Sequence, residues 1–208
     1  MSKSTWIALF AVFTMLVGTA AADDIAPPSW RGEANTSWVQ WEFSTDANPP
    51  VYDAGVLPWG DPQITVEPGC TCLVWQDQHE GRQGVWPLSD EIDVVLENDP
   101  VERPYKDVWV QVTWLEQVDG AVPRIEVLDP YYIYDDTPLF YEEDLGGGWH
   151  HSVFHLPISP NPAQETLKIS GAIYVDELVI DTQCAPEPTA LGLILFGGMA
   201  ALARRRRR

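Results

Sequence analysis

Basic residues are scarce in this chain of 208 residues, and nearly half of them stand at its end. The chain has 12 lysines and arginines against 31 aspartates and glutamates, and five of the arginines are the final five residues. Segment 23–188 keeps all 31 acids and six bases, which gives it a formal charge of −25. Nucleic acids and anionic membrane surfaces require positive patches. Nucleic acid is therefore not expected as a partner, whereas solubility outside the cell is favoured.

Catalytic signatures and helical periodicity are also missing. The sequence contains no Gly-x-Ser-x-Gly, His-Glu-x-x-His or phosphate-binding loop motif. One histidine cluster exists, at His150, His151 and His155, but no carboxylate is locally spaced to complete a metal site with it. No segment of the central part repeats apolar residues at helical spacing. We therefore expect a protein that is not an enzyme and whose folded part lacks helices.

Alternation of apolar and polar residues recurs along the central part. The strand-like stretches are 39–43, 92–97, 108–114, 167–170 and 173–180, with weaker ones at 64–66, 72–75, 124–128 and 152–156. Turn-rich segments separate them, and 129–150 is expected to be a long, acidic and aromatic rim loop. About nine short strands without helices between them are typical of an antiparallel sandwich or barrel. We predict an all-β fold, an antiparallel two-sheet β-sandwich of jelly-roll type, over residues 23–185.

Residues 1–22 have the order of a secretory signal peptide. Lys3 provides a positive start, residues 7–17 form an apolar core, and small residues occupy 20–22. Cleavage is therefore expected after Ala22. A first transmembrane helix is the alternative, but the core is shorter than an ordinary membrane span of about 20 residues. This end predicts export.

The last residues of the chain have an equally ordered pattern. Pro186, Glu187 and Pro188 precede an apolar run over 189–203, and the arginines 204–208 follow. A short, glycine-containing apolar run is compatible with a membrane helix, and the arginines are expected on the cytoplasmic side. A plain C-terminal membrane anchor is the alternative, although it would not require the Pro-Glu-Pro tripeptide.

This order resembles the PEP-CTERM sorting signal of bacteria that make extracellular polysaccharide. The resemblance covers residues 186–208. It implies that an exosortase-type enzyme recognises the tail and cuts it near Pro186, Glu187 and Pro188. It also implies a place at the cell surface or in the extracellular matrix, with transient or permanent membrane anchoring through the C-terminus. The expected organisation is a signal peptide (1–22), a β-sandwich (23–185) and a sorting signal (186–208).

Tryptophans are the candidate ligand contacts. Exposed aromatic rings stack on sugar rings, whereas rings on the apolar phase of a strand fill the core. Trp41 and Trp114 share that apolar phase and are expected in the core. The candidates for a sugar platform lie on the opposite phase or in turn-like segments: Trp38, Trp59, Trp86, Trp109, Tyr131, Tyr132 and Trp149. They favour a structural or adhesive protein that binds polysaccharide. A jelly-roll polysaccharide hydrolase or lyase is the alternative.

The segment 173–181 resembles the closing strand of jelly-roll carbohydrate-binding modules, in which Tyr-x-Asp-Asp/Glu-aliphatic is common. Tyr174 to Leu178 matches this pattern. The resemblance implies that Asp176 ligates a structural calcium ion, and no other cofactor is expected. Calcium requires six to eight oxygen ligands, and the pattern supplies one. The break in alternation at this point is equally compatible with a β-bulge.

The three cysteines are Cys70, Cys72 and Cys184. An exported chain can form disulfides. In an extended stretch Cys70 and Cys72 point to the same face, so either can meet Cys184. We expect a Cys72–Cys184 disulfide, with Cys70–Cys184 as the alternative.

Overall fold

The computed structural model describes residues 24–70, 72–101, 103–128 and 139–185, and this part of the chain forms twelve β-strands and no helix. The strands are β1 (Thr36–Trp41), β2 (Ala54–Val56), β3 (Gln63–Glu67), β4 (Gln76–His79), β5 (Arg82–Leu88), β6 (Glu91–Glu97), β7 (Tyr105–Glu116), β8 (Arg124–Val127), β9 (Leu139–Gly146), β10 (Trp149–Ile158), β11 (Gln164–Ser170) and β12 (Ile173–Ala185). Within the described residues nothing forms a helix long and apolar enough to cross a membrane.

Some expectations fall outside this part of the chain. The signal peptide and the sorting signal, with Pro186, Glu187 and Pro188, lie beyond the described residues. So do Tyr131 and Tyr132. The helices expected at the two ends also lie outside the described residues.

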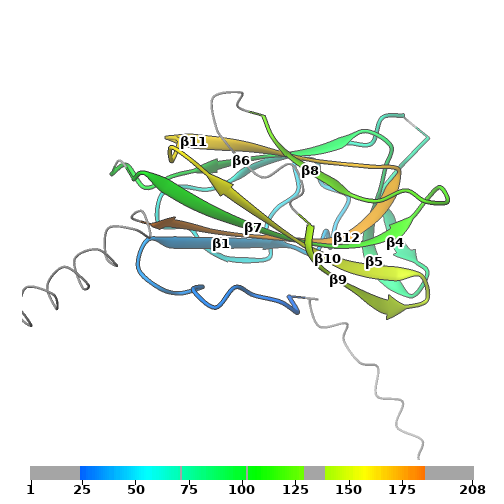
Figure 1. The fold of residues 1–208 in the computed structure, drawn as a ribbon. Coiled ribbons are helices and arrows are strands. Elements are labelled where there is room, and N and C mark those ends of the chain that lie inside the picture. The colour runs from blue at the N-terminus through cyan, green and yellow to red at the C-terminus, as the bar shows by residue number, and fades with distance from the viewer. Residues whose placement is uncertain (1–23, 71, 102, 129–138, 186–208) are drawn as a thin grey trace, which may run out of the picture.

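The strands form two antiparallel sheets that face each other (Figure 1). The larger sheet has eight strands: six run in the order β2-β1-β12-β7-β10-β9, and β5 pairs with β12 and with β4. The smaller sheet has four strands in the order β3-β6-β11-β8. The predicted all-β, antiparallel two-sheet sandwich is confirmed.

Strand β12 is the organising strand of the larger sheet. One of its edges pairs with β7 from Ile173 to Ala185. Its other edge pairs first with β5, over 173–175, and then with β1, over 178–183. The register to β7 shifts between Val175 and Glu177. The β-bulge that the sequence offered as an alternative at Asp176 is therefore present, where β12 changes partners.

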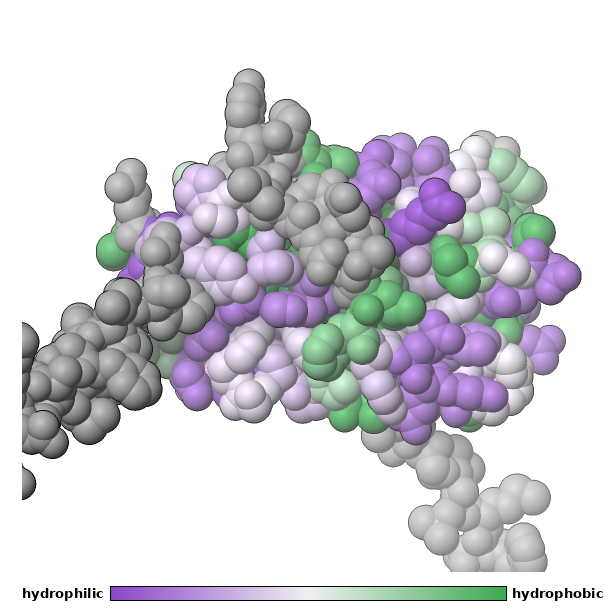
Figure 2. Space-filling view, in the orientation of Figure 1, coloured by the Kyte–Doolittle hydropathy of each residue, from purple (hydrophilic) through white to green (hydrophobic). Residues whose placement is uncertain are grey.

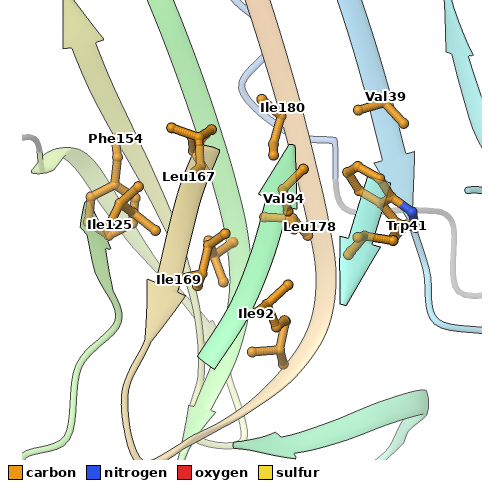
Figure 3. Packing of buried hydrophobic residues seen from close by; sticks show 14 of the residues in the cluster. Val39, Trp41, Ile92, Val94, Ile125, Phe154, Leu167, Ile169, Leu178 and Ile180 are labelled. Carbon is orange, nitrogen blue, oxygen red and sulfur yellow. The ribbon is translucent and has the colours of Figure 1, made fainter. Parts of the chain in front are cut away.

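The core lies between the two sheets (Figure 3). Val39 and Trp41 of β1 and Ile180 of β12 meet Val94 of β6 and Leu167 of β11, and all five are at most 1 % exposed. Full burial of each such aliphatic side chain stabilises the fold by roughly 1.5–3 kcal/mol. Period-two alternation places these residues on one face of their strands.

The two tryptophans assigned to the core are confirmed there. Trp41 and Trp114 are fully buried in the cluster between the sheets. Each alternates with polar or half-buried neighbours on its strand. The side of the strand that the sequence pattern marked as apolar is therefore the side that faces the core.

Two expected elements differ from the structure, and one hairpin was not expected. The second half of the predicted rim loop 129–150 contains β9 and the start of β10. Strand β9 pairs only with β10 among the described strands, and most of its side chains are exposed, so it lacks the alternation that marks a half-buried strand. The stretch 72–75 is not a strand. The pairing of β4 with β5, which form a hairpin, begins only at Gln76. Polar residues in β4 and Pro87 in β5 concealed that hairpin.

Candidate functional site

Two of the expected platform tryptophans are buried. Trp86 is 6 % exposed and Trp149 is 3 % exposed. The indole nitrogen of Trp149 donates to the backbone oxygen of Glu80 (3.1 Å), and the guanidinium of Arg82 lies 5.3 Å from the centre of its ring. The prediction of an exposed platform is therefore wrong for these two residues. The glycines before Trp149 suggested a loop, but the tryptophan begins a strand beneath the β4–β5 hairpin.

Trp38 and Trp109 lie on the outer face of the larger sheet, as their phase predicted. The register places Asp181 of β12 between them, opposite both. Both are half-buried. The Arg31 guanidinium lies 4.8 Å from the ring centre of Trp38, and the indole of Trp109 donates to the backbone oxygen of Ala26 (2.9 Å).

The segment that covers these two rings is residues 24–35, here called the strap. Arg31 pairs with both Asp24 and Asp181. Gln111 accepts from the Ala26 amide at 3.0 Å and donates to Asp24 at 2.8 Å. The strap thus buries polar side chains of β7 and β12 that would otherwise face solvent. Neither Trp38 nor Trp109 presents a free ring.

Burial and the ion pairs of the strap act in opposite directions on the pKa values of Asp181 and Arg31. Burial raises the pKa of Asp181 to about 6, although Arg31 acts in the opposite direction. Burial alone would lower the pKa of Arg31, but its hydrogen bonds to Asp181 and Asp24 hold it above the ordinary value. Arg31 therefore remains charged and holds the strap on the sheet.

Two further acids of β12 lie beside the bulge. Asp176 accepts from Arg82 at 2.8 Å, and burial raises the pKa of Asp176 to about 6. Glu177 accepts from the Gln40 side chain at 2.6 Å. Burial raises the pKa of Glu177 to about 8, and its second carboxyl oxygen has no hydrogen-bond partner among the described residues.

Asp176 was the expected calcium ligand. Its carboxylate engages Arg82, and the described residues contain no group of three or more His, Cys, Asp or Glu side chains arranged to hold a metal ion. A cationic partner therefore already engages this carboxylate, which gives Asp176 a structural role beside the bulge.

The histidines do not converge. His151 is buried against Thr113 (3.0 Å) and Gln111 (3.3 Å), and burial lowers its pKa. His155 contacts Asp107 at 2.6 Å, farther along β10. These two side chains therefore serve separate polar networks on the outer face of the larger sheet.

The cysteines pair differently from the expectation. Cys70 is bonded to Cys72, and Cys184 is free and buried. The predicted Cys72–Cys184 disulfide is therefore wrong, and so is the Cys70–Cys184 alternative. Cys184 lies on the inward phase of β12, where it is paired in register with Lys106. The loop that holds Cys70 and Cys72 precedes the β4–β5 hairpin, which joins the opposite half of β12.

One expected platform residue, Trp59, lines a hollow of about 550 Å³. Three loops form it, namely 58–59 before β3, 97–101 after β6 and 161–163 before β11. Trp59 is half-buried. Gly60 has φ +143°, a conformation that suits glycine, and a side chain there would meet Glu97. The glycine therefore lets the Trp59 loop approach the end of β6.

A buried polar network holds the floor of this hollow. Asn98 donates to the Pro162 backbone oxygen (2.8 Å) and also bonds Glu165. Lys106 bonds both Asn98 and Glu165, and the Lys106 and Glu165 side chains are fully buried. Asp99 accepts from the Val101 amide at 2.9 Å. Buried, fully engaged networks of this kind rigidify the loops that they join.

Lys106 is the one sign of this network that the sequence carries. Lys106 stands two residues before Val108, on the same phase as the core residues of β7. A lysine on an apolar phase requires a buried anionic partner. That partner, Glu165, is far away in the chain, so alternation alone does not identify it.

The hollow combines one aromatic ring with oxygen and amide groups. Glu97, Asn98, Asp99 and Asn161 supply the polar side chains, and no lysine or arginine is among the described residues that line it. The volume lies in the range of ligand pockets, roughly 300–1,000 Å³. Such a site can stack one ring face and hydrogen-bond hydroxyl groups, and it disfavours anions.

Comparison of the chain with protein-family models, with curated proteins and with solved structures found no match.

Proposed function

We propose that this chain is an exported, non-catalytic protein that binds extracellular polysaccharide through the hollow around Trp59. The observation that carries the proposal is the position of Trp59, a half-buried indole beside the exposed carboxyl group of Glu97 and the half-buried amide side chain of Asn161. A pyranose ring offers a C–H face to an aromatic ring and hydroxyl groups to polar side chains. The hollow supplies both kinds of contact on loops held by a buried network.

The charge of the chain narrows the class of sugar. Segment 23–188 has a formal charge of −25, and on the face seen in Figure 2 hydrophilic residues predominate while hydrophobic ones form small patches. An anionic polysaccharide would be repelled by this field. The proposed ligand is therefore a neutral pyranose chain.

The two ends of the chain belong to the same proposal. Residues 1–22 direct export, and residues 186–208 act as a sorting signal that an exosortase-type enzyme cuts near Pro188. The carrying observation is the order of the Pro-Glu-Pro tripeptide, the apolar run and the five arginines. We also assign the sandwich to the jelly-roll type, on the basis of its two antiparallel sheets. The protein would act at the cell surface or in the matrix.

A glycan array of neutral and anionic oligosaccharides, followed by calorimetry on the hits, tests the sugar site. The protein is recovered from cells that express the full-length chain. We expect neutral pyranose hits, and we expect Trp59→Ala to weaken them at least tenfold, about 1.4 kcal/mol. Trp30→Ala is the matched control, because Trp30 is also half-buried but does not line the hollow. Absence of any glycan hit, or equal binding by Trp59→Ala and the parent, would contradict the proposal.

A polysaccharide hydrolase or lyase is the second candidate. Glu97 and Asp99 line the same hollow as Trp59, and glycosidases use two carboxyl groups about 5–10 Å apart. Against this, Asp99 is held by Arg103 at 3.1 Å and by the Val101 amide. Release of reducing ends from a bound polysaccharide, abolished by Glu97→Gln, would favour the enzyme over the binding protein.

A further inference from the structure

A second hollow, of about 320 Å³, lies elsewhere on the sandwich. Its aromatic lining comes from Trp75, just before β4, and from Trp86 of β5. Leu73, Val74 and Pro68 add apolar surface. None of the described residues that line it is basic. Its chemistry therefore repeats that of the Trp59 hollow, with a larger aromatic share.

The walls of this second hollow are held by specific hydrogen bonds. The Trp75 indole donates to the Phe43 backbone oxygen at 2.8 Å. Asn48, which also lines the hollow, donates to the Val66 backbone oxygen at 2.6 Å and accepts from the Val66 amide at 3.1 Å. A pocket whose lining is fixed before binding loses little conformational entropy when a ligand enters.

One polar group of the lining is unsatisfied. Trp86 is more than nine-tenths buried, and its indole N–H has no acceptor among the described residues. Buried donors without a partner are uncommon in folded proteins, and each requires an explanation. The nitrogen itself is closed to solvent, so the ring of Trp86 and not its N–H is the part that lines the hollow.

The two hollows lie at opposite ends of β6. Glu97, the last residue of β6, lines the first hollow. Pro68 lines the second, and its backbone oxygen accepts from the Ser89 amide (3.1 Å), two residues before β6 begins. Seven residues of extended chain separate the two ends by about 20 Å. One sugar ring cannot reach both hollows.

We propose that the Trp75–Trp86 hollow is a second binding site for a neutral pyranose, which makes the protein bivalent and able to bridge two polysaccharide segments. This inference rests on the proposed function, because it assumes that the Trp59 hollow is the first sugar site. Bivalence suits an adhesive or structural role, since each protein then cross-links chains instead of only coating them.

Three matched substitutions test the two sites separately. Val101→Arg places a long side chain at the Trp59 hollow, Val74→Arg does so at the second hollow, and Val118→Arg lies at neither. The three valines are 56 %, 62 % and 61 % exposed, so none of the substitutions removes core packing. The probes are hexasaccharides of β-linked glucose, mannose, galactose and N-acetylglucosamine, measured by calorimetry.

For the hexasaccharide that binds, we expect two sites per chain in the parent and in Val118→Arg. One site should remain in Val101→Arg and one in Val74→Arg. A solution of the long polymer of the same sugar should become more viscous when the parent protein is added. Neither single-site variant should cause this increase in viscosity. Trp75→Ala should match Val74→Arg.

The outcomes separate this inference from the proposed function. One site in the parent, lost in Val101→Arg and unchanged in Val74→Arg, would overturn the second site and leave the proposed function standing. One site lost only in Val74→Arg would overturn bivalence and move the proposed function to the second hollow. No binding of any hexasaccharide would overturn both.

Discussion

Three carboxyl groups of β12 lie on the outer side of the larger sheet, and almost no solvent reaches them. They belong to Asp176, Glu177 and Asp181. Burial raises their pKa values to about 6, 8 and 6, respectively. In the unfolded chain these groups ionise near pH 4. The folded protein therefore binds more protons than the unfolded chain between about pH 4 and pH 8, and its stability falls as the pH rises through this window.

Glu177→Gln should remove much of this pH dependence. A folded carboxyl with a raised pKa stabilises most at low pH, and that contribution is lost as the pH rises towards about 8. Glutamine is neutral at every pH and keeps an oxygen for Gln40. We expect little change at pH 5, but at pH 9 a gain of about 2 kcal/mol and roughly 6 °C in melting temperature.

Calorimetric melting at the two pH values measures this effect. Glu126→Gln is the control, because Glu126 is exposed on β8. An equal change at pH 5 and pH 9 would show that the ionisation of Glu177 does not set the stability.

At the scale of elements, the strap over residues 24–35 completes the larger sheet. It covers the outer sides of β12 and β7 and satisfies Gln111 and Asp181. A sheet in a two-layer sandwich ordinarily turns a solvated face outward. Here the strap covers part of the outer face and buries side chains such as Gln111 and Asp181, so the strap has a structural role. If export includes cleavage after Ala22, the strap lies at the start of the mature chain.

Arg31→Ala should weaken the attachment of the strap, which Ala26 still holds through Gln111 and Trp109, and destabilise the protein. It leaves Asp181 fully buried without the guanidinium that bonds it at 2.6 Å. Removal of one partner from a buried ion pair costs about 3–5 kcal/mol. We expect a loss of that order in chemical denaturation, and faster hydrogen exchange at the Ala26 amide.

Two variants test the cause of this loss. Arg124→Ala removes an exposed arginine of β8 and should change stability little. Adding Asp181→Asn to Arg31→Ala should recover part of the loss, because no buried charge then remains. A loss below 0.5 kcal/mol in Arg31→Ala, on the order of an exposed pair, would contradict a structural role for the strap.

At the scale of the whole molecule, the Trp59 hollow lies at the end of the sandwich where β12 ends. Lys106, in the network beneath the hollow, is paired in register with Cys184, and the next residue, Ala185, ends the strand. The expected sorting signal starts at Pro186. Cleavage of the tail would therefore occur close to the proposed binding site.

Intact mass spectrometry of the exported protein tests processing and thiol state together. We expect a chain that begins at Asp23 and ends near Pro188. Iodoacetamide under non-reducing conditions should label one cysteine after unfolding and none in the native protein. The reason is that Cys184 is the free cysteine, and burial both shields its thiol and raises its pKa. Retention of the five arginines would contradict cleavage of the tail, and rapid native labelling would contradict the burial of Cys184.

The sequence by itself determined the class of fold and the phase of its strands. Alternation shows which side of a strand is apolar, because successive side chains point to opposite faces. For this reason Trp41 and Trp114 were assigned correctly to the core, and Trp38 and Trp109 to the outer face. The same alternation predicted a two-sheet antiparallel architecture, since no helical period interrupts it.

Only the tertiary structure decided what covers each face and which loops meet. The β4–β5 hairpin lies against Trp149 and the strap covers Trp109, and neither contact is visible in local periodicity. The Trp59 hollow joins loops 58–59, 97–101 and 161–163 because β3, β6 and β11 are neighbours in one sheet. Lys106 and Glu165 meet for a similar long-range reason. Local pattern specifies the orientation of a side chain, whereas its neighbours depend on the pairing of distant strands, which is set by the packing of the whole core.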